Sequence, residues 1–233
     1  MQISTIGRSL AVLTVLTVIT GFALWVLYLS DNKIFSPYIS NLHPLTAILI
    51  VSIPGIISLY ILEVRGWFHI FKRGQLIPGI LFSLIITPIF SLLAISLDLV
   101  FRFSGDINIL FPQSILFYPG IAYVVELVFH AIPLAALLLI TSIFFRSSRG
   151  QSQLYLCIFL VSLIEPLYQL DFSVIETSGY LFQTLLIIHL LMFNLMQMYI
   201  YKRFDFISMF LFRIIFYLQW HVIWGELRLV LLF

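Results

Sequence analysis

A carboxylate and an imidazole lie four residues apart within a long apolar stretch of this chain. They are Glu126 and His130, in the segment 119–133 (PGIAYVVELVFHAIP). Residues at this spacing share one face of a helix. Such a pair can position a water for general-base catalysis, bind a metal, or form a hydrogen-bonded contact that joins helices. An ionisable group at the centre of a spanning helix costs about 2.5–3.5 kcal/mol, so we take both residues as candidates for a functional site.

A second polar pair follows in the next apolar run, where Glu165 and Gln169 are again four residues apart. Pro166 lies between them and frees a backbone carbonyl one turn earlier, which a neighbouring polar group can satisfy. The pair can support a site near Glu126 or simply join two helices.

The last apolar run carries a polar face of its own. Arg213, Tyr217 and His221 follow one another at steps of four, and Trp224 and Arg228 continue the stripe. An arginine in such a run requires an acidic partner or a water-filled cavity. His221 is our third candidate for the site. Three acids in other apolar runs could pair with the arginine: Glu126, Glu165 and Asp98.

Cofactor ligation is a weaker interpretation of the same residues. His130, His189 and His221 lie in separate runs, and haem needs two histidines that face each other. Glu126, His130 and His221 are suitable types of zinc ligand, but the chain has no H-E-x-x-H pattern. Asn194 and Gln197 have the character of residues that join helices. We therefore expect neither a cofactor nor a metal.

Composition places these residues in a membrane. The chain is 62% hydrophobic and 9% charged, with a mean hydropathy of +1.13, whereas a soluble protein carries about 25% charge. The net charge is +2 and the basic residues are dispersed, so no nucleic-acid partner is expected. Cys157 is the only cysteine, which excludes an intrachain disulfide framework.

The hydropathy pattern predicts an all-α polytopic membrane protein, a single bundle over residues 1–233. A spanning helix needs about 20 mostly apolar residues. The fourth run contains Pro133, which could break it into two helices, so seven to eight spans are expected. The predicted runs are 9–30, 44–62, 76–101, 114–145, 154–170, 179–200 and 207–231.

Basic residues are distributed unequally between the connections. With seven alternating spans, eight lie on one side of the bilayer and only Lys33 and Arg102 lie on the other, which predicts a cytoplasmic N-terminus in the cell membrane. The first run is too long for a signal peptide and is expected to be retained as a helix. The eight basic residues are Arg8, Arg65, Lys72, Arg73, Arg146, Arg149, Lys202 and Arg203.

The segment Val125-Glu-Leu-Val-Phe-His130 resembles the first motif, Glu-Glu-x-x-x-Arg, of the CAAX-prenyl-protease and bacteriocin-processing family of intramembrane proteases. The family also has Phe-x-x-x-His on the next helix, and a later His followed four residues on by Asn. The match keeps the second Glu as Glu126, a Phe as Phe129 and the last-helix His as His221. It departs from the family at Val125, His130, Gln169 and Gly225, which replace the first Glu, the Arg, the second-motif His and the final Asn.

Two functions follow as expectations. The resemblance implies an intramembrane glutamic-type peptidase independent of metal, or an inactive homologue. Glu126, His130 and His221 would then be catalytic, a membrane-embedded peptide would be the substrate, and Glu165, Gln169, Arg213 and Tyr217 would support the site. The alternative is a non-enzymatic subunit of a membrane complex or transporter, whose buried polar residues contact partner helices or relay protons.

Overall fold

Every regular element in the computed structural model is helical, which confirms the all-α prediction. The structure describes residues 2–35, 42–103, 108–144, 151–170 and 172–233. The elements are α1 (Gln2–Ser30), η1 (Asn32–Phe35), α3 (Pro44–Val64), α4 (Leu76–Phe101), α5 (Ser114–Val125), η2 (Glu126–Ala131), α6 (Ile132–Phe144), α7 (Gln151–Tyr168), α8 (Phe172–Arg203), α9 (Phe206–Tyr217), η3 (Leu218–Trp224) and α10 (Gly225–Leu232).

Within the described ranges, six helices are long and apolar enough to cross a membrane, so the expected seven to eight spans are not confirmed. The predicted span 154–170 corresponds to α7, whose 18 residues include Gln151, Gln153 and Glu165. These polar residues lower its hydropathy below that of the other six. The six are Ile6–Ser30, Pro44–Val64, Leu76–Phe101, Ser114–Phe144, Tyr180–Arg203 and Phe206–Leu232.

The fourth apolar run does not break at Pro133, contrary to the expectation. It continues as one helical segment from Ser114 to Phe144. The π-helical turn η2 precedes the proline, and at its end the Ile132 N–H bonds to the Leu127 carbonyl five residues back. Pro133, which has no N–H to donate to the preceding turn, is the second residue of α6 and directly follows the π turn. The chain therefore widens by a π turn where a break was expected.

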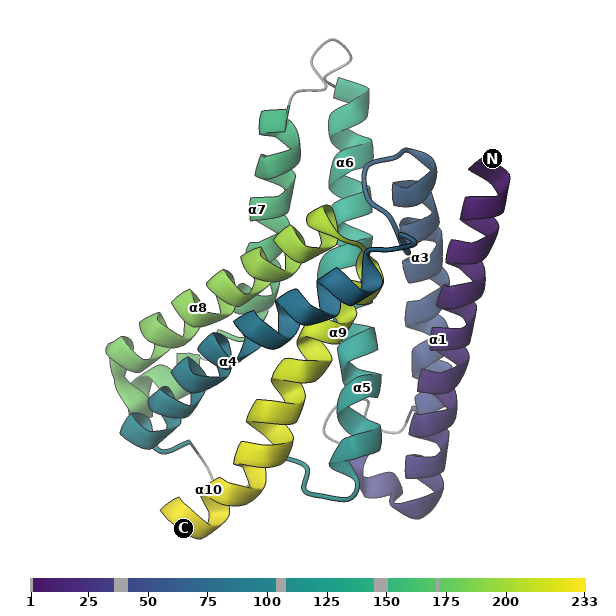
Figure 1. Ribbon diagram of the computed structural model, residues 1–233. Coiled ribbons are helices and arrows are strands. Elements are labelled where there is room, and N and C mark those ends of the chain that lie inside the picture. The colour runs from purple at the N-terminus through teal and green to yellow at the C-terminus, as the bar shows by residue number, and fades with distance from the viewer. Residues whose placement is uncertain (1, 36–41, 104–107, 145–150, 171) are drawn as a thin grey trace.

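Helix α9 lies at the centre of the bundle (Figure 1). It packs against α4, α8 and α5, while α1 packs against α3 and α5, and α7 packs against α8 and α6. The crossing of α4 and α9 depends on Gly79, because a Cβ at that position would overlap the side chain of Ser208. A small residue at this position lets the two backbones approach closely.

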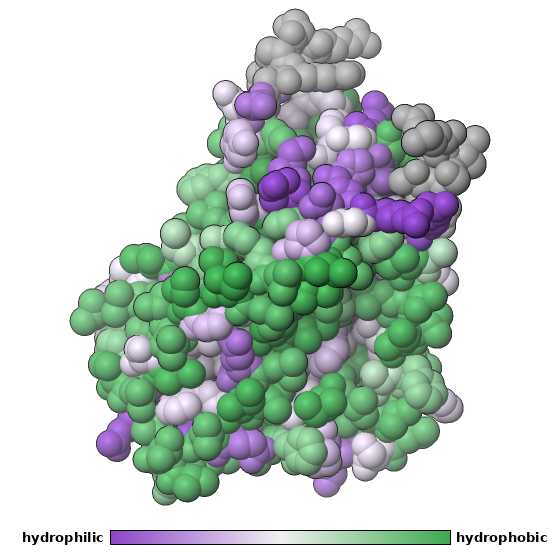
Figure 2. Space-filling model, in the orientation of Figure 1, coloured by the Kyte–Doolittle hydropathy of each residue, from purple (hydrophilic) through white to green (hydrophobic). Residues whose placement is uncertain are grey.

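The outer surface divides into an apolar belt and a hydrophilic end (Figure 2). The segment between α3 and α4 closes that end by packing against the start of α1 and the end of α8. Ser9 Oγ donates to the Phe71 carbonyl at 3.5 Å, and Lys202 Nζ donates to the Trp67 carbonyl at 2.8 Å. The apolar belt suits a lipid bilayer, which is the environment expected from composition.

Candidate functional site

A buried arginine on α9 connects three helices at the centre of the protein. Arg213 is only 2% exposed. Its Nε lies 2.6 Å from Glu126 Oε1, at the start of the π turn η2. Its Nη2 lies 2.8 Å from Glu165 Oε2, and its Nη1 donates to Glu165 Oε1 at 3.0 Å. This bidentate ion pair links α9 to α7. Paired charges of this geometry are the strong form of a hydrogen bond.

The remaining donors of the guanidinium also have partners. Nη1 donates to the Tyr217 hydroxyl at 3.1 Å, one turn along α9. Nη2 donates to Gln197 Oε1 at 2.6 Å and reaches Asn194 Oδ1 at 3.5 Å, both on α8. The sequence suggested that these two amides join helices. In the structure both amides contact Arg213 on α9, and Asn194 Nδ2 also donates to the Ser162 carbonyl on α7 at 3.4 Å.

The carboxylate of Glu126 is enclosed in the same way. Its Oε1 accepts hydrogen bonds from Arg213 Nε and Gln197 Nε2. Its Oε2 lies 3.0 Å from His130 Nδ1, within ion-pair distance but without the alignment of a hydrogen bond. Glu126 and His130 are both fully buried. The four-residue spacing in the sequence therefore places the two side chains together, in a pocket closed to water.

The formal charges in this cluster do not balance. Two carboxylates face one guanidinium, so the group carries one excess negative charge when His130 is neutral. An uncompensated charge in the protein interior costs several kcal/mol. One proton held by the Glu126–His130 pair would make the cluster neutral. His130 Nε2 has no hydrogen-bond partner among the residues that the structure describes.

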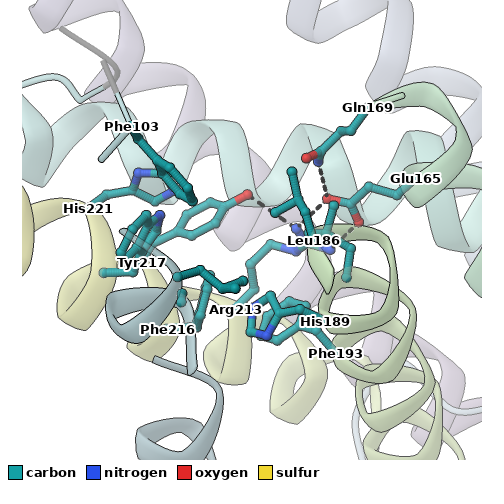
Figure 3. A pocket seen from close by; sticks show the side chains of 14 residues that line it. Phe103, Glu165, Gln169, Leu186, His189, Phe193, Arg213, Phe216, Tyr217 and His221 are labelled. Atoms are coloured by element: carbon teal, nitrogen blue, oxygen red, sulfur yellow. Dashed lines mark hydrogen bonds and ion pairs between the residues drawn. The ribbon is translucent and has the colours of Figure 1, made fainter. Parts of the chain in front are cut away.

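A cavity of about 290 Å³ lies beside the arginine (Figure 3). It is bordered by helices α4, α7, α8 and α9 and by η3. Glu165 and Gln169 form its polar side with Arg213, and Gln169 Nε2 donates to Glu165 Oε1 at 3.3 Å. Glu126 and His130 do not line it. The lining residues are Ala94, Leu97, Phe103, Glu165, Gln169, Leu186, His189, Leu190, Phe193, Arg213, Phe216, Tyr217, Trp220 and His221.

His221 lines this cavity but is not in contact with Glu126 or His130. Its Nδ1 lies 2.6 Å from Asn108 Oδ1, and its ring stacks on Tyr118 with centroids 4.5 Å apart. Figure 3 shows Tyr217 between His221 and the Arg213–Glu165 pair. The predicted catalytic residues are thus divided between two places, while all four of the predicted supporting residues line the cavity with His221.

Both π-helical turns carry candidate residues. The turn η2 begins with Glu126 and contains His130, and the turn η3 (Leu218–Trp224) contains His221. Single π turns inside α-helices occur frequently at functional sites, because the extra residue shifts side chains out of the regular helical register. The sequence contains no simple signal for them.

A second buried ion pair was missed by sequence reasoning. Asp98, considered as a partner for Arg213, instead meets Arg228, with Oδ2 2.6 Å from Nε and Oδ1 accepting from Nη2 at 2.8 Å. Trp224 Nε1 also donates to Asp98 Oδ2 at 2.7 Å. These contacts fix the end of α4 to α10. The placement of Arg228 on the stripe of Arg213 was the available signal, but helix spacing alone does not choose a partner.

The histidines that could ligate a cofactor have different surroundings. His189 lies beside Phe90 and Phe216, with ring centroids 6.0 and 6.2 Å away, while His130 contacts Glu126 and His221 contacts Asn108. Within the described part of the chain, no group of three or more His, Cys, Asp or Glu residues could hold a metal ion.

Comparison with known proteins gives no relative for this chain. No family model matches it, and no curated protein or solved structure is similar to it at a significant level.

Proposed function

We propose that this chain is a non-hydrolytic membrane protein related to the intramembrane proteases that it resembles. In it, a structural ion-pair cluster occupies the place of a catalytic set, and the neighbouring cavity binds a mostly apolar ligand. The observation that carries the proposal is the complete enclosure of the Glu126 carboxylate by Arg213, Gln197 and His130.

Enclosure opposes catalysis for a geometric reason. A general base must come within about 2.6–3.2 Å of the proton that it removes, directly or through one water. Glu126 is buried, its oxygens face protein groups, and it does not border the cavity. An attacking water would have to displace Arg213 or His130 from the carboxylate.

The residues that contact Glu126 suggest different counterparts for the family's later motifs. The last-helix residue beside Glu126 is Arg213, eight positions before His221, and Tyr217 follows it at the four-residue spacing of the family's His-x-x-x-Asn. On the next helix, Glu165 contacts the same arginine. If these positions correspond to the family motifs, the catalytic histidines are replaced by an arginine and a carboxylate that bind each other.

The cavity favours a ligand with one polar end. Most of its lining is aromatic or aliphatic, whereas Glu165, Gln169 and Arg213 are grouped on one side. Binding pockets commonly combine an apolar wall with a few polar groups that orient the ligand. A lipid-like molecule with an apolar end, or a side chain from a partner membrane protein, could occupy the apolar part of the cavity. The second possibility corresponds to a subunit of a membrane complex.

An intramembrane peptidase is the second candidate function. It is favoured by the coincidence of both π turns with resemblance positions and by the presence of the Glu165 carboxylate and the His221 imidazole on one cavity. In such an enzyme Glu165, which faces the cavity, would be better placed than Glu126 to activate a water.

Localisation completes the proposal. We place the hydrophilic end of Figure 2 on the cytoplasmic side of the cell membrane, together with the N-terminus. Six of the eight basic residues lie in the described ranges, within or next to the segments that meet at this end; Arg146 and Arg149 lie outside them. An excess of Lys and Arg marks cytoplasmic connections.

The test compares peptide cleavage by the wild type, Glu126→Gln and Glu165→Gln in proteoliposomes that contain a library of spanning peptides, with products identified by mass spectrometry. We expect the same product profile from all three and from empty liposomes. Cleavage that is lost in either variant, with folding retained, would establish the peptidase and overturn the proposal.

Ligand binding is tested separately by native mass spectrometry of protein taken from membranes. Ala94 is 6% exposed and borders the cavity, so Ala94→Trp should fill it. We expect a bound mass on the wild type that is missing from this variant. The matched control is Ala135→Trp, because Ala135 is also buried but does not line the cavity. No bound mass on any form would contradict a ligand-binding role.

A further inference from the structure

A second cavity, of about 630 Å³, opens near the hydrophilic end between α7 and α8 and is independent of the Arg213 cluster. Its lining includes three cationic side chains and two tyrosines, and contains no carboxylate. The lining residues are Lys72, Tyr155, Ile158, Leu195, Tyr199, Lys202 and Arg203. We propose that this cavity binds the phosphate of an anionic lipid headgroup through Lys72, Lys202 and Arg203.

The lining of the cavity contains no carboxylate, and the carboxylate of Asp205, at the same end of the molecule, is occupied by other donors. Asp205 lies two residues beyond the end of α8 and is fully buried. Its Oδ1 caps α9 by accepting from Ser208 N and Oγ, both at 2.8 Å, and its Oδ2 accepts from the Lys72 backbone N–H at 2.9 Å. Asp205 therefore positions Lys72 through its backbone and leaves the ammonium group available for an anion.

Lys202 is held in place before any ligand arrives. Its Nζ donates to the Trp67 carbonyl at 2.8 Å and lies 5.1 Å from the centroid of the Phe68 ring. An ammonium group has three N–H donors, so two remain for a phosphate. Tyr155 and Tyr199 also line the cavity, and a phenol hydroxyl is a neutral donor. A site ordered in advance loses less entropy on binding.

The surroundings favour a lipid over a soluble phosphate. Exposed apolar side chains continue from the cavity along the two helices that border it. Such a surface suits the acyl chains of a lipid whose headgroup enters the cavity, and basic pockets between spanning helices on the cytoplasmic side bind anionic headgroups. The exposed side chains are Leu156, Phe159 and Leu160 on α7 and Ile188 and Met192 on α8.

The experiment measures lipid binding to the whole protein in neutral detergent by native mass spectrometry, with phosphatidylglycerol and phosphatidylcholine as competing probes. We expect a selective one-to-one complex with phosphatidylglycerol. The double variant Lys72→Gln/Arg203→Gln should weaken it about 30-fold, because each cation near an anionic headgroup contributes about 1 kcal/mol. The matched control is Arg8→Gln/Arg73→Gln, since both residues are exposed and neither lines the cavity.

Three results would overturn the proposal. One is equal binding of the two lipids to the wild type, a measurement that requires no variant to fold. Another is an equal loss of affinity in the control, which would indicate unspecific attraction to the basic end. The third is complete displacement of phosphatidylglycerol by millimolar inorganic phosphate, which would assign the cavity to a soluble anion.

Discussion

Replacing Arg213 with methionine removes the one cation that two buried carboxylates share. The guanidinium contacts Glu126 at 2.6 Å and Glu165 at 2.8 Å. Removing one partner of a buried ion pair destabilises a protein by about 3–5 kcal/mol. Here two carboxylates lose their partner, and protonation sets an upper limit on the loss of stability from each. An ordinary glutamate titrates near pH 4.3, so neutralising one carboxylate at pH 7 costs about 3.7 kcal/mol. With both carboxylates neutralised, the loss of unfolding free energy reaches about 7 kcal/mol.

The dependence on pH follows from the same reasoning. The folded variant takes up as many as two protons that the unfolded chain does not hold at pH 7. Its stability therefore rises as pH falls, by as much as about 2.7 kcal/mol per pH unit for two protons, until the unfolded carboxyls also protonate. The wild type should gain less than the variant over this range, because Arg213 contacts both of its carboxylates.

The assay is reversible unfolding in detergent micelles at pH 7, 6 and 5. Arg8→Met is the matched control, because Arg8 is exposed and its replacement should change stability by no more than about 0.5 kcal/mol. The triple variant Glu126→Gln/Glu165→Gln/Arg213→Met removes all three charges and should recover most of the loss. A single Arg213→Met variant as stable as the control at pH 7, or one with no gain at pH 5, would refute the reasoning.

Two further predictions concern the helix contacts that frame the cluster. Asp98→Asn removes the carboxylate charge that contacts the fully buried Arg228 and should lower the unfolding free energy by about 3–5 kcal/mol in the same assay. A loss below about 1 kcal/mol would show that the pair is dispensable. Gly79→Ala introduces a Cβ that overlaps the side chain of Ser208 and should lower the unfolding free energy by about 1–3 kcal/mol, with recovery in the double variant Gly79→Ala/Ser208→Gly. Gly7→Ala is the control and should leave the unfolding free energy unchanged, because a Cβ at Gly7 meets nothing within 4 Å. Equal effects at the two glycines would contradict the close crossing of α4 and α9.

The sequence alone determined the helices and the neighbours within each helix. Hydrocarbon thickness dictates the length of an apolar run, so the predicted run 76–101 has the limits of α4. Four-residue spacing is a local property of a helix. It predicted the contacts of Glu126 with His130 and Glu165 with Gln169, which are 3.0 and 3.3 Å in the structure.

Only the tertiary structure decided which helices bring these charged groups into contact. Residue spacing shows which face of a helix a side chain lies on, but not which other helix packs against that face. Three acids were therefore equally possible partners for Arg213. The packing of α9 in the bundle brought Arg213 to Glu126 and Glu165, and the end of α4 brought Asp98 to Arg228. The same packing placed His221 against the rings of Tyr217 and Tyr118, and not in contact with Glu126. Helix crossings depend on side-chain shape along the whole contact, and a pattern read along one chain segment does not contain that information.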